Sequence, residues 1–198
     1  MTEHTTTGWD VLDQAHRALR DAVRGVAAGD WDRPTPCQQW SVTQVLQHAA
    51  GDQLAYVAAL TGEGGPTENP FEPSGRLDAA PIAILDEALP AAGLAWAKVG
   101  HDAVDVPTPL PQGAMPAPTA VGACALDAAV HAWDIAIATG QPSPLDPQLA
   151  RVLMPVASGI VEPLRAYGAY AAALEPASTD DDAAALLRYL GRRPDWVH

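Results

Sequence analysis

Residues 119–139 read TAVGACALDAAVHAWDIAIAT, and this stretch decides the fold that the sequence predicts. The stretch is almost wholly apolar, it is rich in alanine, and Gly140 follows it directly. Alanine is the strongest helix former, and a glycine commonly ends a helix. We therefore expect one long helix over residues 119–139.

The composition of the whole chain points to the same fold class. Alanine supplies 40 of the 198 residues, whereas aromatic residues make up only 6%. Because alanine is also a weak strand former, this composition favours an all-α fold and argues against a β-sandwich or barrel. Apolar periodicity and the glycine- and proline-rich segments predict further helices over about 8–28, 41–60, 81–99, 146–174 and 180–190.

The connections shape the expected architecture. Residues 62–80 (GEGGPTENPFEPSGRLDAA) and 100–118 are long segments rich in glycine or proline. Ser41 and Gln44 have the spacing of a capping box, which predicts a helix start at Ser41. We therefore expect a four-helix bundle with long crossover connections and short additional C-terminal helices, built as a single domain over residues 1–198.

The charge excludes several partners. With 24 acidic and 11 basic residues, the formal net charge is -13. This argues against binding to nucleic acid or to an anionic membrane surface, since both need clusters of Lys and Arg. The N-terminus lacks a basic region followed by an apolar one, which predicts a cytoplasmic protein. Two cysteines, Cys37 and Cys124, give no disulfide framework.

The 119–139 helix carries one narrow polar stripe. Its ionisable residues are spaced by three, four and three positions, so they share a stripe roughly 80° wide. They are Cys124, Asp127, His131 and Asp134. Either this stripe is the solvent face of an otherwise buried helix, or it faces the bundle centre. In the second case Asp127 and His131 form half of a metal site, with Cys124 as a structural thiol or a further ligand.

A second helix supplies the missing half. His48 sits beside the apolar seam of residues 41–60, and two His with one carboxylate leave coordination positions open, as in catalytic metal sites. Asp52 follows His48 by one turn and is a support for a metal ligand, a general base or an exposed carboxylate. His16, in contrast, lies among the polar positions of the first helix, and we expect no role for it.

Three motifs in this order resemble a known family. The segment DWDRPTPCQQWSVTQVLQHAAGDQLAYVAALTG, the segment AVHAWDIAIATGQ and the tail LLRYLGRRPDW resemble the mycothiol-dependent maleylpyruvate isomerase type of metal-binding domain, within the DinB-like superfamily. The resemblance implies a bundle with up-down-down-up connectivity and one divalent ion, zinc or nickel. It places the ligands at His48, Asp127 and His131. Where the family usually has Glu, this chain has Asp127, which reaches about one methylene less far.

The resemblance also implies chemistry. We expect a metal-dependent thiol transferase or isomerase that uses mycothiol as cosubstrate and acts on a small electrophilic molecule, with Asp52 as its catalytic residue. Such an ion lowers the pKa of the thiol, and the thiolate is the nucleophile. Related proteins are often dimers, so a homodimer is one expected state. Two alternatives stay open, namely a non-catalytic binding or stress-response protein and a metal-independent enzyme that uses the bundle cavity.

Overall fold

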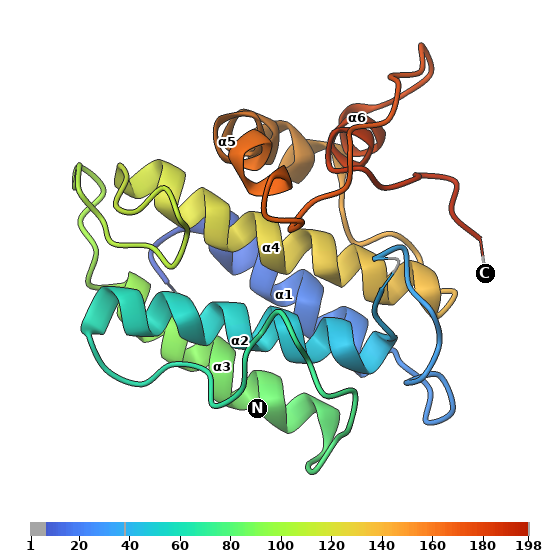
Figure 1. Ribbon diagram of the computed structural model, residues 1–198, viewed down its shortest axis with the longest axis horizontal. Coiled ribbons are helices and arrows are strands. Elements are labelled where there is room, and N and C mark those ends of the chain that lie inside the picture. The colour runs from blue at the N-terminus through green and yellow to red at the C-terminus, as the bar shows by residue number, and fades with distance from the viewer. Residues whose placement is uncertain (1–6, 38, 198) are drawn as a thin grey trace.

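The structure, a computed structural model, describes residues 7–37 and 39–197, and helices dominate this range (Figure 1). The helices are α1 (Asp10–Arg24), α2 (Val42–Thr61), α3 (Pro81–Trp96), α4 (Ala117–Ala138), α5 (Pro147–Arg165) and α6 (Asp182–Tyr189). In the described ranges, β-pairing is limited to isolated bridges such as that between Val106 and Met115. The predicted all-α class and the helix order are confirmed.

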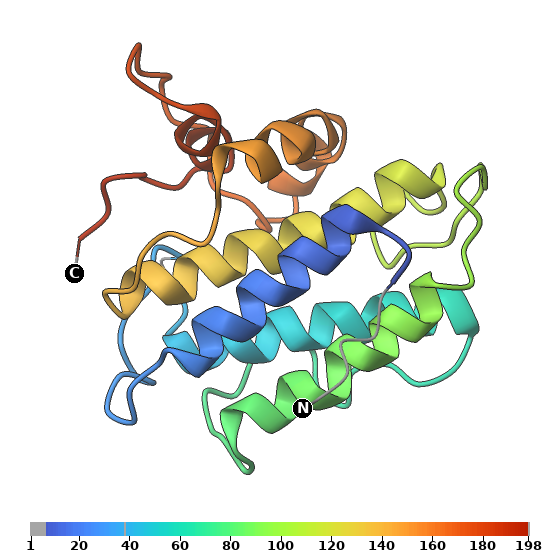
Figure 2. The same ribbon diagram turned by 180° about the vertical axis from the view of Figure 1, so that it is seen from behind.

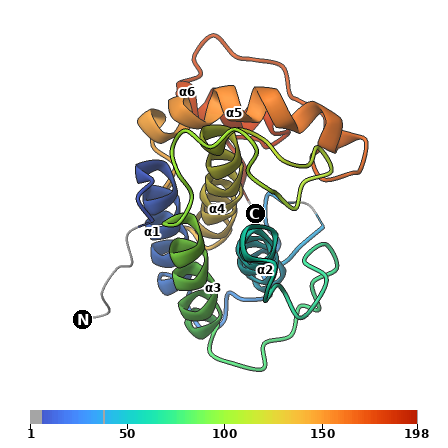
Figure 3. The same cartoon turned by 90° about the vertical axis from the view of Figure 1, so that its left-hand side faces the viewer.

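Helices α1 to α4 form the bundle, which Figure 3 shows nearly end-on. Following the colours of Figure 1, α1 and α4 run in one direction and α2 and α3 in the opposite one. Helices α1 and α2 each pack against both α3 and α4, and α4 also contacts α5. Because α2 and α3 are parallel, residues 62–80 must cross the length of the bundle to join them, which explains this long connection.

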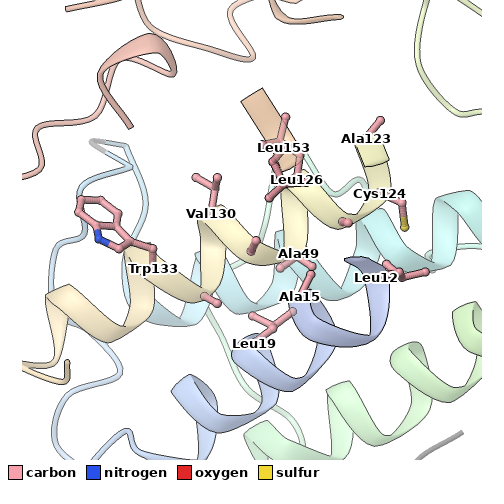
Figure 4. Packing of buried hydrophobic residues seen from close by; sticks show 14 of the residues in the cluster. Leu12, Ala15, Leu19, Ala49, Ala123, Cys124, Leu126, Val130, Trp133 and Leu153 are labelled. Atoms are coloured by element: carbon pink, nitrogen blue, oxygen red, sulfur yellow. The ribbon is translucent and has the colours of Figure 1, made fainter. Parts of the chain in front are cut away.

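The core is built around α4. Figure 4 shows apolar side chains of α1, α2 and α5 gathered around this helix, and the rear view in Figure 2 shows α1 lying along it. Small residues let the neighbours approach closely: a Cβ atom added at Gly122 would lie 2.6 Å from Cγ2 of Val156 on α5. The abundant alanines of α4 therefore serve tight helix packing. Helix α4 is long and apolar enough to span a membrane, but 89% of its most apolar window is buried inside the structure, as in a core helix.

Helices α5 and α6 lie across one side of the bundle, where α5 packs on α4 and α6 packs on α5 (Figures 1 and 3). The expectation that helix extends over residues 146–174 is wrong at its C-terminal end, because α5 ends at Arg165. Gly168 adopts a left-handed conformation (φ 76°), and the amide of Ala169 donates to the carbonyl of Leu164. This arrangement stops the helix although residues 169–173 are mostly alanine. Pro155 and Pro163 lie inside α5 without ending it.

Candidate metal centre

Three side chains from two bundle helices converge on one point. His48 lies on α2, whereas Asp127 and His131 lie one turn apart on α4. Nε2 of His48 is 3.2 Å from Oδ1 of Asp127, and Nε2 of His131 is 3.3 Å from the same oxygen. One ligand atom from each residue lies within 4.8 Å of the other two. The structure thus brings together the three residues that the sequence suggested as ligands.

The spacing of these atoms fits a metal ion. An ion bound tetrahedrally at about 2.0–2.1 Å separates neighbouring nitrogen and oxygen donors by about 3.3–3.4 Å. The two Nε2–Oδ1 distances, 3.2 and 3.3 Å, are close to this value. Asp127 therefore reaches both histidines despite its short side chain. Its second oxygen, Oδ2, is buried and has no hydrogen-bond partner among the described residues, so it is available to a cation.

The charges of the cluster stabilise one another. Burial lowers the pKa of His131, but Asp127 and hydrogen bonds to Asp127 and Asp134 outweigh burial and raise this pKa to about 9. Burial raises the pKa of Asp127, yet His131 and His48 hold it well below its usual range. His131 is thus an imidazolium at neutral pH next to a carboxylate. Because a metal ligand must be deprotonated, metal binding at Nε2 of His131 requires release of a proton.

A loop carbonyl orients His48. The carbonyl oxygen of Pro70, in the crossover loop, lies 2.9 Å from Nδ1 of His48. Since a carbonyl can only accept, Nδ1 carries the proton and Nε2 is left to face Asp127. The loop approaches α2 closely at Gly51, where an added Cβ would lie 3.0 Å from Cγ of Pro70. The long loop is therefore part of the site.

A buried carboxylate orients His131 in the same way. Oδ2 of Asp134 lies 2.9 Å from Nδ1 of His131, and Asp134 is fully buried. An ionised carboxylate accepts only, so Nδ1 donates to it. Burial raises the pKa of Asp134, but Arg192 outweighs this and lowers it, which keeps the acceptor charged. Both histidines consequently direct Nε2 towards Asp127.

Two aromatic side chains border the cluster. The ring of Trp40 lies 4.6 Å from that of His48 and 6.3 Å from that of His131, measured between centroids. Phe71, from the crossover loop, contacts His48 edge-on at 5.4 Å and is 60% exposed. An exposed aromatic ring next to the candidate ligand atoms offers an apolar surface for a small molecule.

Asp52 lies beside the cluster without joining it. It follows His48 by one turn on α2 and is half-buried. Burial, and after it the charge of Asp127, raises the pKa of Asp52 well above its usual range. Asp52 is thus a carboxyl group suited to carry a proton near the three ligands.

Other candidates lie outside the cluster. Cys124 is buried, and its thiol donates to Oε1 of Gln53 at 3.1 Å, so it is a core residue rather than a further ligand. Nε2 of His16 donates to the same oxygen at 2.8 Å. The assignment of His16 to the polar face of its helix is wrong, because it is only 9% exposed. Its position four residues after Leu12 and three before Leu19 would have indicated the apolar face.

Sequence reasoning missed the residues that orient the ligands. Pro70 acts through its backbone carbonyl, which no side-chain pattern reveals, and Arg192 contacts α4 from a remote segment. The sequence pattern places Asp134 in the polar stripe but assigns it no role of its own. Its position three residues after His131 was the available signal, since a metal-bound His commonly donates its other nitrogen to a carboxylate.

Comparison with known proteins identifies the family of this chain. Residues 12–136 match the family described as mycothiol maleylpyruvate isomerase N-terminal domain. The chain is also 32% identical over 161 residues to two uncharacterized proteins of Mycobacterium tuberculosis, MT0763 of strain CDC 1551 / Oshkosh and Rv0738 of strain H37Rv. Each alignment covers 75% of this chain and 79% of the relative. No solved structure matches significantly. The match over residues 12–136 and these two relatives show that the chain belongs to the mycothiol maleylpyruvate isomerase N-terminal domain family.

Proposed function

We propose that this protein is a divalent-metal-dependent thiol transferase or isomerase that uses a mycothiol-type thiol and acts on a small electrophilic substrate. The observation that carries the proposal is the convergence of Nε2 of His48 and Nε2 of His131 on Oδ1 of Asp127. Three protein ligands leave coordination positions open, which is the arrangement of a catalytic metal site rather than a structural one. The family match supports the choice of thiol.

The three ligands would hold zinc or nickel through two neutral imidazoles and one carboxylate. An ion bound there would lower the pKa of a thiol, so that the thiolate forms near neutral pH. The protein contributes the fixed direction of both imidazoles, each held through Nδ1 by Pro70 or Asp134. Preset ligand directions favour one ion geometry over adventitious binding.

Asp52 would act as the general acid or base of the reaction. Its raised pKa means that the group can take up and release a proton nearer to neutral pH than an exposed Asp. In a thiol addition, the thiol loses its proton as the sulfur bonds to the substrate, and a proton must reach the substrate atom that receives the displaced electron pair. In a transfer, that proton goes to the leaving group. Asp52 lies on the same helix face as His48, one turn further along α2, so it borders the place where a substrate would meet the thiol.

The substrate would approach beside the crossover loop 62–80. Phe71 belongs to this loop, is exposed and contacts the ring of His48. The ring of Trp40 contacts the same histidine. These rings would contact the apolar part of a small electrophile and exclude water from the reacting atoms. We propose a cytoplasmic location and a small-molecule substrate; the homodimeric state stays a prediction from the sequence.

The proposal is tested by mixing zinc-loaded protein with mycothiol and a fluorogenic electrophile. We expect the wild type to accelerate thiol conjugation and His48→Ala to lose this acceleration. His101→Ala, which removes an exposed histidine stacked on Trp9, is the matched control and should behave as wild type. Glutathione in place of mycothiol tests the thiol.

Two outcomes would favour the alternatives. Zinc binding without acceleration would indicate a binding protein. Acceleration that persists after chelation would indicate an enzyme that does not use a metal ion. Asp127 is oriented towards both histidines, and this supports a metal-dependent enzyme over a binding protein and over a metal-independent enzyme.

A further inference from the structure

A buried ion pair ties the C-terminal segment to the last turn of α4. Nε of Arg192 lies 2.9 Å from Oδ1 of Asp134, and an Nη atom lies 2.8 Å from Oδ2, so the guanidinium grips the carboxylate with two donors. Asp134 is fully buried and Arg192 is 8% exposed. The two residues are 58 positions apart. Arg192 lies beyond residues 12–136, which match the family.

The end of α6 aims Arg192 at this carboxylate. Gly191 has a left-handed backbone (φ 78°), its amide donates to the carbonyl of Arg188, and the amide of Arg192 donates to the carbonyl of Leu187. These two bonds form a Schellman motif, which fixes the direction of the residue after the glycine. A Cβ atom at Gly191 would lie 2.8 Å from Cβ of Ala171, so the motif is also packed against the preceding loop.

The same carboxylate oxygen serves both partners. Oδ2 of Asp134 accepts from Nδ1 of His131 at 2.9 Å and from the Nη atom of Arg192 at 2.8 Å. Two hydrogen bonds from the guanidinium of Arg192 restrain rotation of the Asp134 carboxylate. They thereby fix the direction of its hydrogen bond to His131 as well. The chain from Arg192 to His131 therefore ends on a ring whose Nε2 faces Asp127.

We propose that Arg192 is a positioning residue of the metal centre, which acts through Asp134 to hold the His131 ring in its ligating direction. This inference rests on the proposed metal site. It extends the functional unit into the C-terminal segment, which packs on the bundle through α5. The neighbouring Arg193 pairs with Asp195 on the surface and takes no part in this chain of contacts.

The test compares zinc affinity, measured by competition with a chromophoric chelator, in the wild type, Arg192→Lys and Arg193→Lys. Lysine keeps the positive charge but loses the two-donor grip. We expect Arg192→Lys to weaken zinc binding roughly 10- to 100-fold, as loss of a partner of a metal ligand commonly does. The visible absorption spectrum of the cobalt-substituted protein should change as well, because it reports ligand geometry. Arg193→Lys should match the wild type in both.

Arg192 could affect zinc affinity only by stabilising the fold. Zinc affinity is therefore compared only among variants that are folded. If Arg192→Lys loses helix content by circular dichroism, the double variant Asp134→Asn with Arg192→Met replaces it, since removing both charges leaves no buried charge unpaired. We expect this variant to fold and to bind zinc weakly. Wild-type affinity and an unchanged cobalt spectrum in a folded variant would overturn the positioning role. A wild type that binds no zinc would overturn the proposed function, and this inference with it.

Discussion

The imidazole of His48 and the carboxylate of Asp127 lie 3.2 Å apart although 79 positions separate them in the sequence. This contact joins the middle of α2 to the middle of α4 and places an acidic group between two histidines. Because all three groups are largely shielded from solvent, their interaction is stronger than that of surface charges. The consequences of changing these residues follow from that arrangement.

The first prediction concerns Asp127. Asp127→Asn keeps the size of the side chain but removes the charge that attracts a cation. We expect zinc affinity to fall by more than the roughly 10- to 100-fold loss that follows removal of a partner of a metal ligand. Competition with a chelator measures this. Asp127→Glu, which keeps the carboxylate, should retain binding; equal affinity in Asp127→Asn and wild type would show that this oxygen is not a ligand.

The second prediction concerns Asp52. In the zinc-loaded protein, Asp52→Asn should slow thiol conjugation by roughly 10²- to 10⁴-fold, the usual contribution of a general acid or base. Zinc affinity should stay close to the wild-type value, because Asp52 lies outside the ligand cluster. Asp32→Asn, at an exposed carboxylate, is the matched control. A parallel loss of zinc affinity and rate in Asp52→Asn would instead make Asp52 part of the metal site.

The third prediction follows from the buried pair of His16 and Gln53. Burial, against a smaller opposing effect of the hydrogen bond to Gln53, lowers the pKa of His16 from 6.5 to about 4. Between these values the unfolded chain binds a proton that the folded protein does not, so the free energy of unfolding falls as the pH falls. The full loss is about 3 kcal/mol, and it is absent above pH 6.5.

Urea unfolding at several pH values between 7.5 and 4.5 checks this. His16→Gln keeps a donor for Gln53 but does not titrate, so its stability should depend less on pH than that of the wild type. His101→Gln changes an exposed histidine and should keep the wild-type dependence. An unchanged pH dependence in His16→Gln would contradict the burial of a neutral imidazole.

The fourth prediction concerns the start of α2, the helix that carries His48. The hydroxyl of Ser41 accepts from the amide of Gln44, and the side chain of Gln44 accepts from the amide of Ser41. Ser41→Ala should lower the free energy of unfolding by about 1 kcal/mol. Ser158→Ala, at an exposed helix-interior hydroxyl, should change it by less than about 0.5 kcal/mol. Equal effects in both variants would show that the capping box adds nothing.

Local patterns were enough to predict the helices and two of their ends. The capping box of Ser41 and Gln44 is present as predicted, and α2 ends at the left-handed Gly62. The end of α5 was placed too far along the chain, because the alanines after Gly168 favour a helix by propensity while the glycine stops it. A left-handed glycine competes with local propensity, and only packing decides which one prevails.

The residues of the candidate site also fall into those that the sequence predicts and those that it does not. His48, Asp127 and His131 could be found because helical spacing places them on defined faces of two apolar helices. Arg192 could not be distinguished from Arg193 by any local rule, since the two adjacent arginines differ only in the direction that Gly191 gives them. Contacts that depend on tertiary packing across 58 positions leave no trace in local periodicity.

The most direct test of the account is the metal content of the protein purified without a chelator and without a His tag. Elemental analysis should find close to one zinc or nickel ion per wild-type chain. His48→Ala should lose the ion, and His101→Ala should retain it. A wild type that contains no metal and takes up no more zinc on titration than His48→Ala would contradict the metal centre.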